Sequence, residues 1–121
     1  MGKEVRDKFN FENLVVYQKA LDYVDFVYSL TANFPKDEVF GLTSQFKRAA
    51  VSISLNIGEG SGGTTPEFRN FIRISYRSLN ECVVCSTIAR RREYITEKQL
   101  QESRTKLLEI TRMLSGLKKS L

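Results

Sequence analysis

Residues 45–60 read Q-F-K-R-A-A-V-S-I-S-L-N-I-G-E-G, and this stretch decides the fold. On a helix of about 100° per residue its apolar side chains form two stripes. One stripe contains Phe46, Ile53 and Ile57, and the other contains Val51 and Leu55. An ordinary surface helix has a single apolar face. The stretch therefore predicts a helix that is covered on nearly all sides.

A polar seam lies between the two stripes, on a band roughly 80° wide by the same geometry. Its members are Gln45, Arg48, Ser52, Asn56 and Glu59. Because a buried polar group costs free energy unless it is hydrogen-bonded, the seam predicts either an active site or a structural network within the bundle or between subunits. Arg48 and Glu59 are about three turns apart on one helix, so each needs a partner from another helix or chain. We favour the network.

Apolar periodicity predicts four helical segments, at about residues 12–33, 37–59, 66–92 and 97–119. Phe34-Pro35 ends the first, because the residue before a proline disfavours the helical region. The glycines at 58, 60, 62 and 63 are expected to end the second. Thr65-Pro66-Glu67 and Thr96-Glu97-Lys98-Gln99 are typical helix starts. With short loops between them, these helices predict one all-α domain over residues 1–121, an up-down-up-down antiparallel four-helix bundle.

The net charge of +5 belongs to the second half of the chain. Residues 1–63 hold 7 Lys+Arg and 8 Asp+Glu, whereas residues 64–121 hold 12 and 6. A one-sided basic excess suits a polyanionic partner such as nucleic acid. The candidate phosphate contacts are Arg69, Arg73, Arg77, Arg90, Arg91 and Arg92. The first three recur at every fourth residue, about 6 Å apart on a helix; the alternative is that they pair with acids of a neighbouring helix or subunit.

Catalytic and metal-binding residues are scarce. The chain has no histidine, which removes the commonest general base and the commonest metal ligand. Its two cysteines form a C-x-x-C at Cys82 and Cys85, but they lie in the middle of a predicted helix and are expected to be core residues. We therefore expect a non-enzymatic protein with no cofactor, no metal and no small-molecule substrate.

Location and assembly follow from the apolar residues. The first ten residues are charged and form no signal peptide, and no apolar run approaches membrane length. We expect a cytoplasmic protein with reduced cysteines and no membrane partner. Val51, Leu55, Val84 and Ile88 give two helices a second apolar face, which predicts a homo-oligomer with closed symmetry.

Several spaced residues resemble those of a known family. They are Phe11-Glu12-x-Leu14-x-Val16-Tyr17-Gln18-Lys19-Ala20, Phe34-Pro35-x-x-Glu38, Gly41-Leu42-x-x-Gln45-x-x-Arg48-Ala49-x-x-Ser52-x-x-x-Asn56-Ile57-x-Glu59-Gly60, Glu67-Phe68-x-x-Phe71 and Ser78-Leu79-x-Glu81. Over residues 11–95 the chain is similar to bacterial four-helix-bundle proteins encoded within intervening sequences of 23S ribosomal RNA genes. The stretch Arg90-Arg91-Arg92-Glu93 departs from the family's more usual apolar and glycine-containing sequence.

The resemblance implies an up-down four-helix bundle that assembles into a five-fold ring. Related bundles serve as accessory proteins to the reverse transcriptases of diversity-generating retroelements, where they are thought to bind nucleic acid. The family supplies no established catalytic or binding residues. Two hypotheses follow: an oligomeric bundle that binds RNA through its basic half, or a protein-binding scaffold or accessory subunit with no affinity for nucleic acid.

Overall fold

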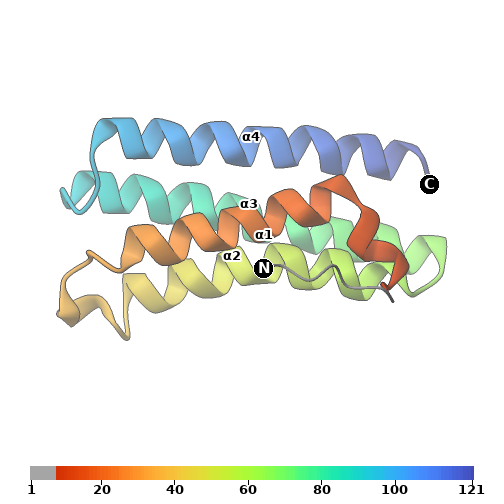
Figure 1. Ribbon diagram of the computed structural model, residues 1–121, viewed down its shortest axis with the longest axis horizontal. Coiled ribbons are helices and arrows are strands. Elements are labelled where there is room, and N and C mark those ends of the chain that lie inside the picture. Colours follow the sequence, from red (N-terminus) through yellow and green to blue (C-terminus); the bar gives the residue numbers. More distant parts are fainter. Residues whose placement is uncertain (1–7) are drawn as a thin grey trace.

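The computed structural model describes residues 8–121, which form four long α-helices, two short 3-10 helices and no strand. In chain order the elements are η1 Asn10–Asn13, α1 Val15–Thr31, η2 Lys36–Glu38, α2 Leu42–Ser61, α3 Thr65–Arg91 and α4 Glu97–Lys119. The four long helices lie side by side and alternate in direction (Figure 1). Each packs against the next along the chain, and α4 also packs against α1. The predicted all-α up-down bundle is confirmed.

Two expectations extend beyond this range. The single domain over residues 1–121 and the charged amino-terminal segment both include residues 1–7, which lie outside the described residues. Within residues 8–121, none of the helices combines the length and apolar character that crossing a membrane requires.

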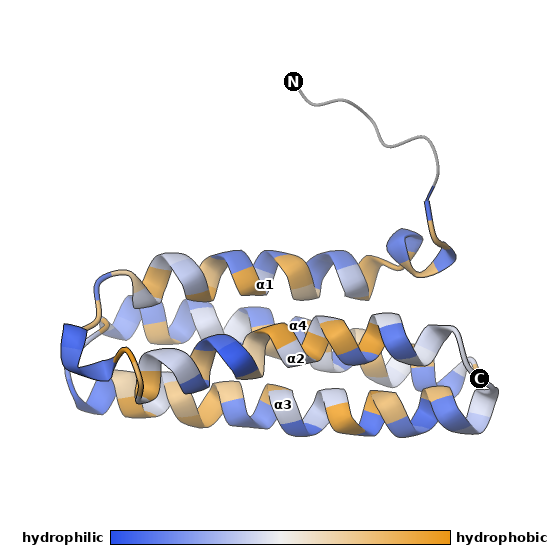
Figure 2. Cartoon of the chain, turned by 90° about the horizontal axis from the view of Figure 1, so that it is seen from below, coloured by the Kyte–Doolittle hydropathy of each residue, from blue (hydrophilic) through white to orange (hydrophobic). Residues whose placement is uncertain are grey.

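Side chains from all four helices form one core, and apolar and polar residues alternate along each helix (Figure 2). The largest fully buried side chains are Tyr23, Phe46, Ile53, Ile57, Ile72, Leu107, Ile110 and Leu114. The first apolar stripe of residues 45–60 is thus buried as predicted. The second is not covered within the protomer, because Leu55 is 54% exposed and Val51 is only half-buried.

Helix α2 begins later and ends later than predicted. The Glu38 carboxylate accepts a hydrogen bond from the backbone N–H of Leu42 at 3.0 Å, so the helix begins at Leu42 and not near residue 37. Glycine does not end it at residue 59 either, since Gly58 and Gly60 are both helical and the helix continues to Ser61. A Cβ on Gly60 would lie 2.5 Å from the Cβ of Phe71 on α3. Glycine at this position therefore permits a close approach of two helices.

The other helix ends follow local capping chemistry. The cap of α3 is Thr64, one residue before the predicted Thr65: its hydroxyl accepts from the N–H of Glu67 at 3.3 Å, and the Glu67 carboxylate accepts from the N–H of Thr64 at 2.7 Å. The predicted capping box of α4 is confirmed, with Thr96 and Gln99 bonded in the same reciprocal way at 3.1 and 2.8 Å. These caps place each helix start independently of tertiary contacts.

Candidate functional site

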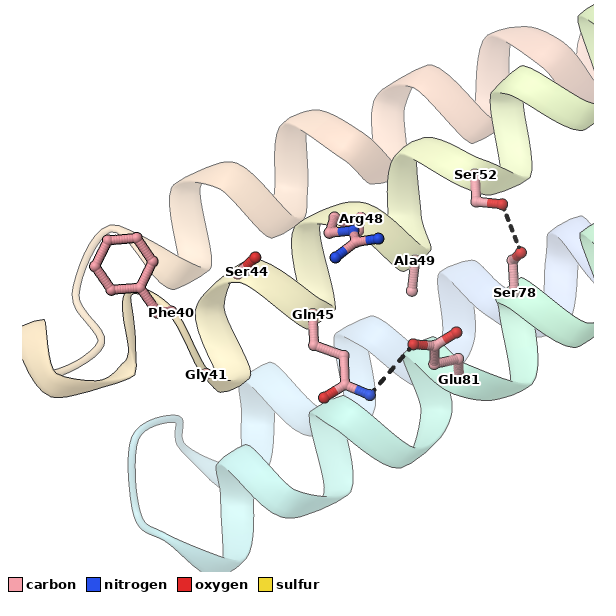
Figure 3. Close-up of a pocket in the computed structure, with 9 residues that line it drawn as sticks. All are labelled: Phe40, Gly41, Ser44, Gln45, Arg48, Ala49, Ser52, Ser78 and Glu81. Atoms are coloured by element: carbon pink, nitrogen blue, oxygen red, sulfur yellow. Dashed lines mark hydrogen bonds between the residues drawn. The ribbon is translucent and has the colours of Figure 1, made fainter.

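Helices α2 and α3 border a groove of about 530 Å³ at the end of the bundle where α1 joins α2 (Figure 3). Its lining residues are Phe40, Gly41, Ser44, Gln45, Arg48, Ala49, Ser52, Ser78 and Glu81. Three of the five seam residues predicted from the sequence, Gln45, Arg48 and Ser52, thus lie in this groove. Asn56 and Glu59 lie farther along α2 and do not line it.

The neutral seam residues connect α2 to α3. Ser78 on α3 donates from Oγ to the Oγ of Ser52 at 2.8 Å, and the Asn56 side-chain amide donates to the same Oγ at 3.0 Å and to the Ser52 carbonyl at 2.8 Å. The Gln45 amide donates to the Glu81 carboxylate at 3.4 Å, a longer contact (Figure 3). Two of these contacts, Ser52–Ser78 and Gln45–Glu81, join α2 to α3, and the Asn56 bonds stay within α2.

The charged seam residues are different. Arg48 and Glu59 are exposed, and neither forms a hydrogen bond or ion pair with another side chain of residues 8–121. Gln45 is also exposed, and Ser52 and Asn56 are half-buried. The expectation of a helix enclosed nearly all round is therefore wrong for the single protomer. Helices α1 and α3 flank α2, and η1 packs against its outer side at Gly58 through Phe11, but residues 8–121 leave the outer side around Arg48 uncovered.

Nothing in this groove indicates enzymatic activity. Ser52 and Ser78 bond to each other, and the chain contains no histidine to activate either. Cys82 and Cys85 are free, buried core residues, as predicted. Burial raises the pKa of the Cys85 thiol to about 11 and also raises that of Cys82, so both stay protonated and unreactive. Among residues 8–121 no group of three or more His, Cys, Asp or Glu side chains is placed to hold a metal ion.

Three of the candidate arginines form one exposed row on α3. Arg69, Arg73 and Arg77 are all exposed. Arg73 donates to the side-chain carbonyl of Asn70 at 2.6 Å, and none of the three forms an ion pair with an acid of residues 8–121. Their guanidinium groups are accessible in the protomer.

The other three arginines lie about 20 Å or more away along the same helix, thirteen or more residues after Arg77. Arg90 is half-buried and pairs with Glu97 at 3.3 Å, whereas Arg91 is exposed. The Tyr94 hydroxyl, and to a lesser extent the Glu38 carboxylate, raise the pKa of Arg92. The six arginines therefore form two groups and not one continuous surface.

A contact that the sequence did not predict joins the two loops at this end. Tyr94 donates from its hydroxyl to the Glu38 carboxylate at 2.8 Å, and its ring lies 5.3 Å from that of Phe34. The hydrogen bond from the Leu42 N–H, followed by that from Tyr94, lowers the pKa of Glu38. The only sequence signal was a carboxylate placed four residues before the first residue of a helix.

The family resemblance can now be tested directly. Residues 12–116 match the family model described as 23S rRNA-intervening sequence protein. The chain belongs to this family. A solved structure similar to it is the crystal structure of a protein with unknown function from the S23 ribosomal protein family of Bacteroides thetaiotaomicron VPI-5482. That protein is 27% identical, the match covers 87% of this chain and 99% of that chain, and the TM-score is 0.77. No match is found among curated proteins.

The family name describes a position within 23S rRNA genes and specifies no activity. The bundle, the seam and the arginine row are therefore the basis for a functional proposal.

Proposed function

We propose that this member of the 23S rRNA-intervening sequence protein family is a non-enzymatic homo-oligomer that binds RNA along α3. The observation that carries the proposal is the row of Arg69, Arg73 and Arg77, which is exposed and forms no ion pair with residues 8–121. Guanidinium groups without acidic partners remain available for phosphate oxygens, which they bind in bidentate geometry.

The row suits a phosphodiester backbone better than a base sequence. Successive arginines lie about one helical turn apart, roughly 6 Å between side chains. Contacts to phosphate fix the position of a nucleic acid but carry no sequence information. Recognition through this row would therefore depend on charge and RNA shape.

Additional positive charge lies at the same end of the bundle. Tyr76 on α3 and Ser115 on α4 form a hydrogen bond of 2.7 Å, which fixes the heights of these antiparallel helices relative to each other. Three residues further along α4 are the exposed Lys118 and then Lys119, near the height of Arg73. These lysines add positive charge at the same height of the bundle as the arginine row, which favours a polyanionic ligand.

The assembly part of the proposal rests on exposed apolar residues. Phe40 is 98% exposed, and Leu55, Val84 and Ile88 are 54%, 56% and 42% exposed. Patches of this kind usually mark an interface. Closed symmetry is the common arrangement for identical chains, and the five-fold ring implied by the family resemblance is one form of it. The same residues favour the alternative function, a scaffold or accessory subunit that binds another protein and has no affinity for RNA.

The test combines the mass of the protein in solution with RNA titrations. Structured and single-stranded RNA are titrated at two salt concentrations, and binding through several phosphates should weaken steeply as salt increases. Replacement of Arg69, Arg73 and Arg77 by Ala should abolish RNA binding, while the helical content measured by circular dichroism and the number of copies in the assembly stay unchanged. The same replacement of Arg90, Arg91 and Arg92 is the matched control, and should weaken binding less because Arg90 is already paired with Glu97.

Two results would contradict the proposal. A stable assembly that binds no RNA even at low salt leaves only the scaffold function. A triple variant at residues 69, 73 and 77 that loses its assembly shows that those arginines pair with acids of a neighbouring subunit.

A further inference from the structure

The outer surfaces of α2 and α3 both present exposed apolar residues beside a charge that has no ion-pair partner among residues 8–121. On the α2 side these residues are Phe40, Leu55 and Arg48. The α3 side carries Val84 and Ile88, with Glu81 exposed one turn before Val84. Neither surface is covered by another helix of residues 8–121.

Heights along the bundle axis can be compared between the two surfaces. Helices α2 and α3 run in opposite directions, Ser52 on α2 bonds to Ser78 on α3, and Gly60 on α2 packs on Phe71 on α3. A residue of α2 therefore lies at the same height along the bundle as the residue of α3 for which the two residue numbers add to about 130. Three levels can be compared, one at Phe40 in the turn just before α2, one at Arg48, and one at Leu55, which lies opposite a further α3 residue two turns before Glu81. At these levels the pairs are Phe40 with Ile88, Arg48 with Glu81, and Leu55 with the half-buried Ile74.

A rotation about an axis parallel to the helices preserves these heights. It can bring α2 of one copy against α3 of the next copy while every residue stays at its own level. Identical chains most often assemble by closed rotational symmetry. Such a contact places apolar residues opposite apolar residues at two levels and an arginine opposite a glutamate between them. The complementarity in both charge and apolar character points to a second copy of this chain as the occupant.

We propose that the outer surface of α2 packs on the outer surface of α3 of the next copy, with Arg48 paired to Glu81 of that copy and Phe40 seated beside Val84 and Ile88. The inference rests on the proposed homo-oligomer and names its interface. Because each copy uses two different surfaces, the contact is heterologous, and its repetition by a closed rotation about an axis parallel to the helices forms a ring. It gives Arg48 an ion-pair partner, which residues 8–121 of its own protomer do not supply.

Arg48 and Glu81 also line the same groove of one protomer, so the test must separate the two pairings. Arg48→Glu and Glu81→Arg are each expected to weaken association by about 100-fold or more, because a like-charged pair replaces an opposite one. Native mass spectrometry should then show the monomer of 13.9 kDa for each variant alone.

Mixing the two variants restores the contact only between chains. In a mixture, the carboxylate introduced by Arg48→Glu in one variant faces the guanidinium introduced by Glu81→Arg in the other, and the remaining junction has the unchanged Arg48 and Glu81. Mixed assemblies should therefore appear, with one like-charged junction left if the ring has an odd number of copies, whereas a pairing within one protomer would stay broken in both variants. If mixing never restores association, the inference is overturned.

Phe40→Ser tests the apolar part. Phe40 is 98% exposed in the protomer, so the variant should keep its helical content and lose assembly. Leu108→Ser is the matched control, since Leu108 is 53% exposed on α4, outside the proposed interface, and should assemble normally. Unchanged assembly of Phe40→Ser contradicts the inference.

Two further outcomes are decisive. A two-fold contact between the α2 helices of two copies would instead pair Arg48 with Glu59. In that case mixing Arg48→Glu with Glu59→Arg would restore association, whereas mixing it with Glu81→Arg would not. That result overturns the proposed interface. A wild-type protein that is monomeric at micromolar concentration overturns the homo-oligomer itself. The RNA titration is independent of both, so a failed interface and a failed RNA-binding function are distinguishable.

Discussion

Two polar regions of this bundle are built in opposite ways. Between α1 and α4, Tyr23 and Ser103 are both 0% exposed and form a hydrogen bond of 2.8 Å. Burial also raises the pKa of the Tyr23 hydroxyl, which keeps it neutral. On the outside of α2, Arg48 and Glu59 are exposed and have no side-chain partner among residues 8–121.

The difference shows how to distinguish polar groups that maintain the fold from polar groups that remain available to bind another molecule. A desolvated hydroxyl must be paired, because leaving it unpaired costs about 1–3 kcal/mol. An exposed charge is hydrated and needs no partner to keep the protomer folded. Polar groups that the chain pairs inside its own core therefore maintain the fold. Charges that it leaves unpaired on the surface remain available for another molecule.

The largest expected effect breaks the buried region. Tyr23→Ala should lower the free energy of unfolding by about 3–5 kcal/mol, because a fully buried aromatic ring is lost. Tyr23→Phe should cost about 1–2 kcal/mol, since Ser103 then loses its partner. Arg48→Ala should stay within about 0.5 kcal/mol. The measurement is chemical denaturation at a concentration where the wild type has the monomer mass of 13.9 kDa in solution, because any association would add to the apparent stability.

The comparison between the two regions fails if Arg48→Ala costs as much as Tyr23→Phe under these conditions. Arg48 would then be part of the protomer's own structure. Loss of assembly without loss of protomer stability is the result that agrees with an exposed, available charge.

A smaller effect is expected where α2 and α3 approach most closely. Gly60→Ala would place a Cβ 2.5 Å from the Cβ of Phe71, and should cost about 1–3 kcal/mol by forcing the helices apart. Gly116→Ala on α4 is the matched control: no atom lies within 4 Å of its Cβ position, so it should stabilise the protein by up to about 1 kcal/mol. Thermal and chemical denaturation measure both, and equal effects would show that Gly60 does not set the spacing of the two helices.

Gly60 also shows which features of this fold cannot be predicted from local sequence. The four helices and the Thr96 cap were predictable, because apolar periodicity and capping are local signals. Glycine is locally a helix breaker, but Gly60 is helical, and its lack of a Cβ is what admits the close approach of Phe71. That outcome depends on a residue eleven positions away on another helix, which no local rule contains.

The polar seam shows a second limit of the same kind. Helical geometry correctly placed Gln45, Arg48, Ser52, Asn56 and Glu59 on one side of α2. It did not reveal which neighbour covers that side, because coverage depends on how the helices are arranged around the core. The prediction of an enclosed helix was therefore wrong for one protomer, and the bond between α2 and α3 through Ser52 could not be specified from the sequence.

Ser52 offers an intermediate case between the two regions. It is half-buried, and its Oγ accepts hydrogen bonds from Ser78 and Asn56 at 2.8 and 3.0 Å. Ser52→Ala should lower the free energy of unfolding by about 1 kcal/mol, less than Tyr23→Ala. Ser44→Ala, at a half-buried serine of the same groove without a side-chain hydrogen bond to residues 8–121, should be near neutral. If Ser52→Ala leaves the free energy of unfolding unchanged, then the whole polar seam belongs to the polar groups that do not maintain the fold and remain available for another molecule.

The smallest effect concerns two carboxylates, one with hydrogen-bond partners within the chain and one without. Glu38 accepts hydrogen bonds from Leu42 and Tyr94, which lower its pKa below the ordinary value of 4.5, whereas Glu59 has no such partner among residues 8–121. Because the folded pKa is lowered, the stabilisation by Glu38 is fully present above about pH 4.5 and is lost as pH falls through the folded pKa. Glu38→Gln should thus be less stable than wild type at pH 7 and approach it at low pH, while Glu59→Gln should follow wild type throughout. Denaturation at pH 7, 5 and 3 checks this, and a Glu38 difference that grows on acidification would contradict it. Glu38 is not enclosed in the core. If Glu38 nevertheless stabilises the fold as Tyr23 does, then a hydrogen-bond partner within the chain, more than burial, distinguishes polar groups that maintain the fold from those that stay available.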